Sequence, residues 1–99
     1  MTADAVPGLT LGDFETCIGA SFTIETESGP QALELVVADP LPQSIRVEGG
    51  FRLEFAGPAE PRLPQSIYRF TVGDTAHDIF IVAIGQRPDG RLRYEAVFF

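Results

Sequence analysis

The chain has 99 residues, with 14 acidic side chains against seven arginines and no lysine, and its net charge is −7. Such an acidic surface repels nucleic acid phosphates and anionic lipids, so we expect no nucleic acid partner and no membrane insertion. A single cysteine excludes an internal disulfide and a cysteine-based zinc site. The composition is that of a single globular domain over residues 1–99, and we expect residues 1–8 to be flexible. No secretory signal is visible, so we expect the protein to be cytoplasmic.

Residues 10–18 are predicted to form the one helix of the chain. Leu11, Phe14 and Ile18 fall on a single helical face, which suits packing against a sheet. Cys17 lies next to that face. We interpret it as a small buried side chain rather than a nucleophile, because the histidine that could activate it is far along the chain.

From residue 21 onward the pattern is that of short β-strands. Apolar and polar side chains alternate, and glycine, proline and aspartate break the alternation at each turn. The turn Pro88-Asp89-Gly90 joins the last two strands into a hairpin. The predicted strands are 21–27, 31–38, 51–55, 66–72, 79–84 and 92–98. The sequence therefore predicts a mostly β fold with about six antiparallel strands in a small barrel or sandwich.

The apolar positions of these strands predict the core. Strand 79–84 is apolar on both faces, which fits a sheet covered on both sides or a patch that a partner buries. The expected core residues are Phe22, Leu35, Leu53, Phe55, Tyr68, Phe70, Phe80, Val82, Tyr94 and Ala96.

No group of residues indicates catalysis, a cofactor or a metal. His77 is the single histidine, and we interpret it as a solvent-exposed loop residue before the strand at 79–84. On a strand, Asp78 beside it would point to the other face. A zinc site needs several nitrogen or sulfur ligands, and the acidic residues lack the spacing of a calcium loop. We therefore predict no enzyme, although a small hydrolase that uses His77 with Asp74 or Asp78 is a less favoured alternative.

The pentapeptide Leu-Pro-Gln-Ser-Ile occurs twice, at residues 41–45 and 63–67. The flanking residues do not repeat, so this is not a solenoid unit. We interpret the two copies as loops that enter strands with the same residue types. The alternative is a paired binding feature, since loops often carry function.

The last strand changes polarity along its outer face. Arg93 and Glu95 are followed on the same side by Val97 and Phe99. Apolar groups on a solvated face are favourable only when something covers them. These four residues are therefore the candidate interface, at which the chain would bind another protein or itself. The alternative is that the N-terminal helix covers this end of the sheet.

Several motifs resemble those of an uncharacterised bacterial family, a domain of unknown function. They are FxLxFxGP at 51–58, LPQxxY at 63–68, the apolar run ending in Ile-Gly at 79–85, and YEAVF at 94–98. Members of that family are encoded beside phage-tail-collar-like proteins, and the resemblance implies a role around a tail-like or surface appendage. The chain departs from the family at Ala83, where proline is usual, and at Phe99, where asparagine is usual.

The function we predict from these observations is a non-catalytic module for protein interaction or assembly. The alternative is a small-ligand-binding β-barrel, whose pocket would be lined by the eight phenylalanines and two tyrosines. Aromatic side chains in so small a β domain are more often core residues, which favours the interaction module.

Overall fold

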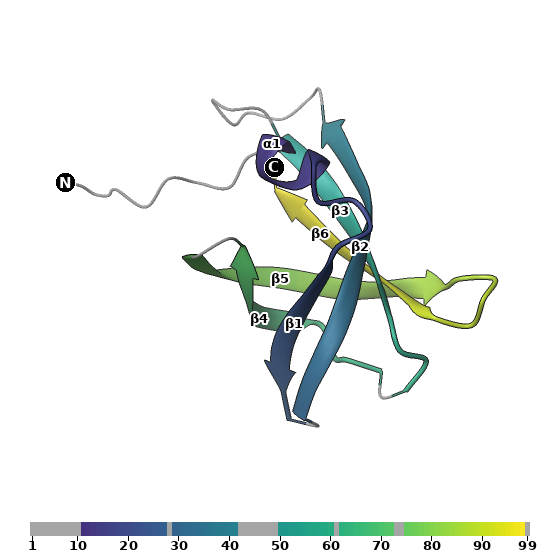
Figure 1. Ribbon diagram of the computed structural model, residues 1–99. Coiled ribbons are helices and arrows are strands. Elements are labelled where there is room, and N and C mark those ends of the chain that lie inside the picture. Colours follow the sequence, from purple (N-terminus) through teal and green to yellow (C-terminus); the bar gives the residue numbers. More distant parts are fainter. Residues whose placement is uncertain (1–10, 28, 42–49, 61, 73–74, 99) are drawn as a thin grey trace.

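The computed structural model describes residues 11–27, 29–41, 50–60, 62–72 and 75–98. The described residues form one short helix and six strands (Figure 1). The elements are α1 (Leu11–Glu15), β1 (Ser21–Thr26), β2 (Gly29–Leu41), β3 (Gly50–Gly57), β4 (Ser66–Val72), β5 (Thr75–Gln86) and β6 (Leu92–Phe98). The predicted class, about six antiparallel strands in a small barrel or sandwich with one short helix, is confirmed, and of the two forms the structure has the barrel.

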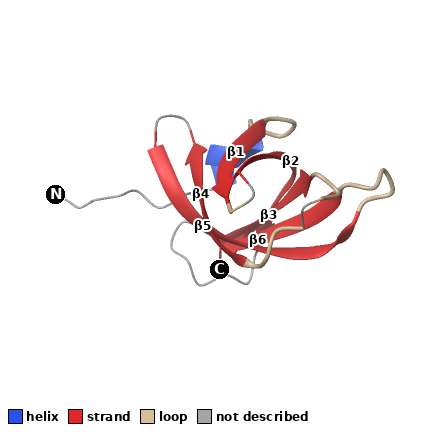
Figure 2. Cartoon of the chain, turned by 90° about the horizontal axis from the view of Figure 1, so that it is seen from below, coloured by secondary structure: helices blue, strands red, loops and turns tan. Residues whose placement is uncertain are grey.

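The strands follow the order β1-β2-β3-β6-β5-β4, and every pairing is antiparallel. The two outer strands β1 and β4 lie against each other, so the sheet curls into a nearly closed barrel (Figure 2). The long strands β2 and β5 make this possible because each pairs with one neighbour along its first half and another along its second. In β5, residues 75–81 pair with β4 and residues 82–86 pair with β6.

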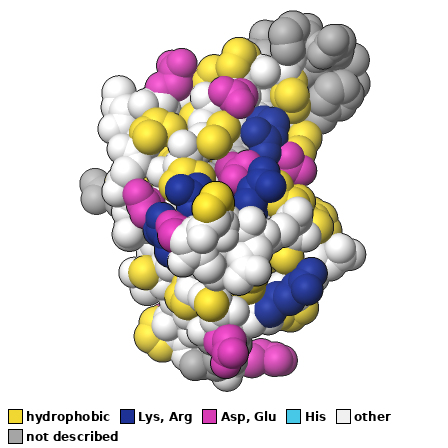
Figure 3. Space-filling view, turned by 90° about the vertical axis from the view of Figure 1, so that its right-hand side faces the viewer, with side chains coloured by type: hydrophobic (Ala, Val, Ile, Leu, Met, Phe, Trp, Pro, Cys, Tyr) yellow, Lys and Arg dark blue, Asp and Glu magenta, His cyan; other side chains and the backbone are white. Residues whose placement is uncertain are grey.

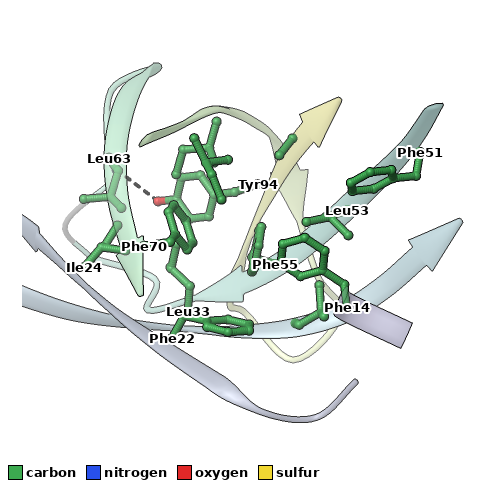
Figure 4. Close-up of a cluster of buried hydrophobic side chains, with 14 residues drawn as sticks. Phe14, Phe22, Ile24, Leu33, Phe51, Leu53, Phe55, Leu63, Phe70 and Tyr94 are labelled. Carbon is green, nitrogen blue, oxygen red and sulfur yellow. Dashed lines mark hydrogen bonds between the residues drawn. The ribbon is translucent and has the colours of Figure 1, made fainter. Parts of the chain in front are cut away.

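One face of each strand supplies the core, which fills the barrel (Figure 4). Aromatic rings dominate it, and the rings of Phe51 and Phe98 stack with their centroids 4.5 Å apart. Gly57 leaves room for the side chains of Leu33 and Tyr94, because a Cβ there would lie 2.7 Å from Leu33 Cδ2 and 3.0 Å from Tyr94 Cε2. The FxLxFxG motif thus places two phenylalanines and a leucine inward, with a glycine where the tyrosine ring approaches the backbone.

The helix closes one end of the barrel, but it is shorter than predicted. Phe14 is fully buried against Phe51 and Phe98. After Glu15 the chain turns back, with the Cys17 N–H donating to the Phe14 carbonyl at 2.8 Å. Ile18 lies in this turn and is 50% exposed, so its predicted place on the packing face is wrong.

The other end of the barrel is closed by the second copy of the repeated pentapeptide. Leu63 is buried, and its N–H donates to the Tyr94 hydroxyl at 3.0 Å. The Tyr68 hydroxyl donates to the Pro64 carbonyl at 2.7 Å. Figure 4 shows Leu63 and Phe14 at opposite ends of the buried cluster. Of the first copy, only Leu41 falls within the described residues, so the interpretation as a paired feature lies mostly outside them.

Seven of the ten predicted core residues are buried, Tyr68 and Val82 are half-buried, and the prediction for Phe80 is wrong. Phe80 is 51% exposed and Val82 is half-buried, while their neighbours Ile79 and Ile81 are buried. Because β5 is apolar on both faces, alternation alone does not choose the inward one. The pairing with β4 makes that choice, since it sets Ile79 opposite the half-buried Tyr68. The predicted residues that are buried are Phe22, Leu35, Leu53, Phe55, Phe70, Tyr94 and Ala96.

Candidate protein-binding surface

The outer face of β3 and β6 carries a network of ion pairs. Arg93 donates to both carboxylate oxygens of Glu54, from Nε at 2.8 Å and from Nη2 at 3.0 Å. Arg52 donates to Glu54 at 3.1 Å and to Glu95 at 2.8 Å. The side of the molecule in Figure 3 shows arginine and acidic side chains lying side by side across its middle. Two of the predicted interface residues, Arg93 and Glu95, therefore have partners within their own sheet.

Glu54 is the buried centre of this network. The hydrogen bonds from Arg93 hold the pKa of the Glu54 carboxyl below its usual value, against the opposing effect of burial, and Arg52 adds to the lowering. The same hydrogen bonds raise the pKa of Arg93. Both groups therefore stay ionised near neutral pH, and their charges are neutralised by each other.

The other two predicted interface residues differ from this pair. Val97 is 53% exposed on the outer face of β6, opposite Arg52 on β3, so an apolar side chain does lie open there. Phe99 lies outside the described residues. The helix packs on the inner face of β6, where Phe14 contacts Phe98, so it leaves Val97 uncovered.

A second exposed apolar feature lies on the outer face of β4 and β5. Ile67 and Phe80 are directly opposite each other on the two strands, and they are 61% and 51% exposed. Next to them, Arg69 donates to Asp78 at 3.2 Å in a solvent-exposed ion pair. Sequence reasoning missed this Ile67–Phe80 pair because it placed Phe80 in the core. The apolar character of both faces of strand 79–84 was the signal that pointed to it.

His77 and Asp78 point to opposite sides of β5, as the sequence predicts. The interpretation of His77 as an exposed loop residue is wrong, because β5 begins at Thr75 and His77 is half-buried within it. His77 is paired across the strands with the core residue Phe70, while Asp78 is paired with Arg69 on the outer face. Within the described ranges, no three His, Cys, Asp or Glu side chains are grouped so that they could hold a metal ion. No helix in that part of the chain is long and apolar enough to cross a membrane.

Two surface hollows flank the Leu63–Pro64 segment. One of about 200 Å³ lies beside Thr26, Arg62 and Tyr68, and the other, of about 270 Å³, lies beside Gln65 and Val82. Both are open to the surface rather than inside the barrel, where the aromatic side chains pack on one another.

A known protein family matches nearly the whole of this chain. A family model described as Domain of unknown function (DUF6916) matches residues 9–98. The chain belongs to this family. The match spans α1 and all six strands of the described fold, so the DUF6916 domain corresponds to the barrel and its helix. No curated protein and no solved structure matches the chain.

Proposed function

We propose that this DUF6916 domain is a non-catalytic module that binds another protein through the outer face of β4 and β5. The observation that carries the proposal is the Ile67–Phe80 pair, two large apolar side chains that lie opposite each other and are more than half exposed. Removing a phenylalanine side chain from water is worth about 1.5–3 kcal/mol. A partner that covers this pair gains, from each side chain, the part of that free energy that corresponds to its exposed surface.

The state of the barrel interior supports an interaction module over a ligand-binding barrel. The aromatic side chains that could line an internal pocket, such as Phe22, Phe55 and Phe70, pack on one another instead. The environment of His77 supports a non-catalytic role, because Asp78 points away from it and binds Arg69. A general base needs an orienting carboxylate within hydrogen-bond reach.

Because of the ion-pair network, we place the centre of the proposed interface on β5 rather than on β6. Arg93 and Glu95 are bonded to Glu54 and Arg52, so neither offers a free charge to a partner. Val97 can extend the apolar surface on the β6 side. The net charge of −7 favours a basic partner over a second copy of the chain. The resemblance to domains encoded beside phage-tail-collar-like proteins supports a partner from a tail-like or surface appendage.

The test compares matched substitutions of exposed apolar residues. Phe80→Ser and Ile67→Ser alter the proposed interface, and Ile18→Ser alters a residue of similar exposure in the turn after α1. Binding is measured by calorimetry against a phage-tail-collar-like protein, and self-association by sedimentation. We expect the first two variants to weaken binding by about tenfold or more and Ile18→Ser to leave it unchanged. Equal binding by all three variants would contradict the proposal.

A further inference from the structure

Among the residues that the structure describes, the first half of β5 pairs with a strand on one side only. Residues 75–81 pair with β4 on one side, whereas β6 pairs with β5 only from Val82 onward. In Figure 1, β5 and β6 spread apart from their common hairpin. Within the described part of the chain, residues 75–81 have no paired strand on the side away from β4. Their N–H and C=O groups on that side are a template for another strand.

This edge lacks the features that usually prevent strands from associating. Edge strands are commonly protected by proline, lysine, a bulge or short length. Residues 75–81 contain neither proline nor lysine, and the irregularity in the pairing of β5 comes later, between Ala83 and Gly85. Their one acidic side chain, Asp78, is partly neutralised by Arg69. The edges of β1 and β4 differ, because those two strands lie against each other.

We propose that residues 75–81 of β5 form a strand-addition site, whose occupant is an extended, basic segment of another protein. This inference rests on the proposed function and names the chemistry of its partner. The added strand would pair with the free edge, while its outward side chains would lie beside Phe80 and Asp78 on the outer face.

The register of the sheet argues against a second copy as the occupant. A strand that continues the sheet places outward residues opposite outward residues. In a symmetric pairing of β5 with itself, Asp78 then lies opposite Asp78 or, in the two nearest registers, opposite Phe80 or Ala76. None of these arrangements sets a cationic residue of the second copy opposite Asp78, and two chains of charge −7 also repel.

The same alignment of outward residues predicts which side chains the partner segment carries. A lysine or arginine opposite Asp78 and a large apolar residue opposite Phe80 satisfy both outward side chains. Because outward residues recur every second position, these two partner residues are two apart in its sequence. Asp78 is more than half exposed, so a second cation can reach its carboxylate beside Arg69.

The experiment uses amide hydrogen exchange of the full chain, followed by NMR residue by residue. The probe is a capped peptide as long as the free edge, with arginine and isoleucine two residues apart among threonine and valine. A second peptide carries glutamate in place of arginine. In the free protein, we expect the amides of 75–81 that point away from β4 to exchange rapidly. The arginine peptide should slow their exchange at least about tenfold, and the glutamate peptide should bind at least about fivefold more weakly.

Reversing the charge of residue 78 tests whether the peptide contacts Asp78. Asp78→Arg should reverse the preference, so that the glutamate peptide binds more tightly, whereas the control Asp39→Arg on β2 should not. The proposal is overturned if all amides of 75–81 are already protected in the free monomer, or if millimolar peptide protects none of them. It is equally overturned if both peptides bind alike. Should the edge stay unprotected while Phe80→Ser still weakens binding of the tail-collar-like protein, the proposed function stands and the strand-addition site does not.

Discussion

Glu54 on β3 and Glu95 on β6 lie directly opposite each other in the sheet, and one residue, Arg52, donates a hydrogen bond to both. Two carboxylates opposite each other on neighbouring strands repel. Here the repulsion is offset by Arg52 and by the two hydrogen bonds from Arg93 to Glu54. Since these contacts form only when β3 and β6 are aligned as observed, we infer that the network stabilises this register.

Glu54→Gln should destabilise the domain. The substitution removes the negative charge that Arg52 and Arg93 share and replaces one acceptor oxygen with an NH2 donor, although both guanidinium groups are partly exposed and can be rehydrated. We expect the free energy of unfolding at neutral pH to fall by about 1–3 kcal/mol, measured by urea denaturation. The control is Asp39→Asn, which removes an exposed carboxylate 3.7 Å from Arg52 and should cost less than about 0.5 kcal/mol. A similar loss in both variants would show that burial of Glu54 is unimportant.

The same carboxylate should make stability depend on pH. The pKa of Glu54 in the folded chain lies below its usual 4.5, with the hydrogen bonds from Arg93 as the largest cause. The unfolded chain therefore binds this proton more readily. The contribution of Glu54 is fully present above pH 4.5 and is lost as the pH falls from there through the lower folded pKa. Urea denaturation between neutral and acid pH should show a steeper loss in the wild type than in Glu54→Gln. Parallel curves would contradict the assignment.

Sequence reasoning predicted the fold class and most of the core, because alternation along β1 and β3 has a single apolar face. It failed at Phe80, where both faces are apolar and only the pairing with Ile67 reveals which is outward. It also misplaced Ile18, because the chain turns back after Glu15 before the helical face is complete.

The candidate interface shows the same limit. From the sequence, Arg93 and Glu95 are predicted to lie on a solvated face that becomes apolar at Val97. Their partners Glu54 and Arg52 are about 40 positions earlier in the chain, so their ion pairs depend on strand pairing that no local pattern specifies. The unpaired edge of residues 75–81, in the part of the chain that the structure describes, likewise follows from strand order, since the same residues would be paired if β6 continued alongside them.

Tyr94→Phe should loosen the end of the barrel that Leu63 closes. The Tyr94 hydroxyl accepts the hydrogen bond from the buried Leu63 N–H, and its removal leaves that donor without a partner. We expect a loss of about 1–3 kcal/mol in the free energy of unfolding, and faster exchange of the Leu63 amide. Tyr68→Phe removes an exposed hydrogen bond to Pro64 and should cost less, about 0.5–1 kcal/mol. If the Leu63 amide exchanges at the same rate in both variants, the Tyr94 hydroxyl does not hold this segment.

Phe80→Ala and Ile79→Ala test which face of β5 builds the core. Ile79 is buried among the inward residues, so its truncation should lower the free energy of unfolding by about 2–5 kcal/mol. Phe80 is half exposed, and its truncation should cost about 1 kcal/mol or less, mainly through the lower strand preference of alanine. Chemical denaturation of the two variants measures the difference, with the slope of the transition showing whether both still unfold as one cooperative unit. A large loss in Phe80→Ala would mean that the ring is covered within the isolated chain, and the apolar surface on which the proposed interface rests would not exist. A small loss there combined with weakened partner binding is the result that the proposal requires.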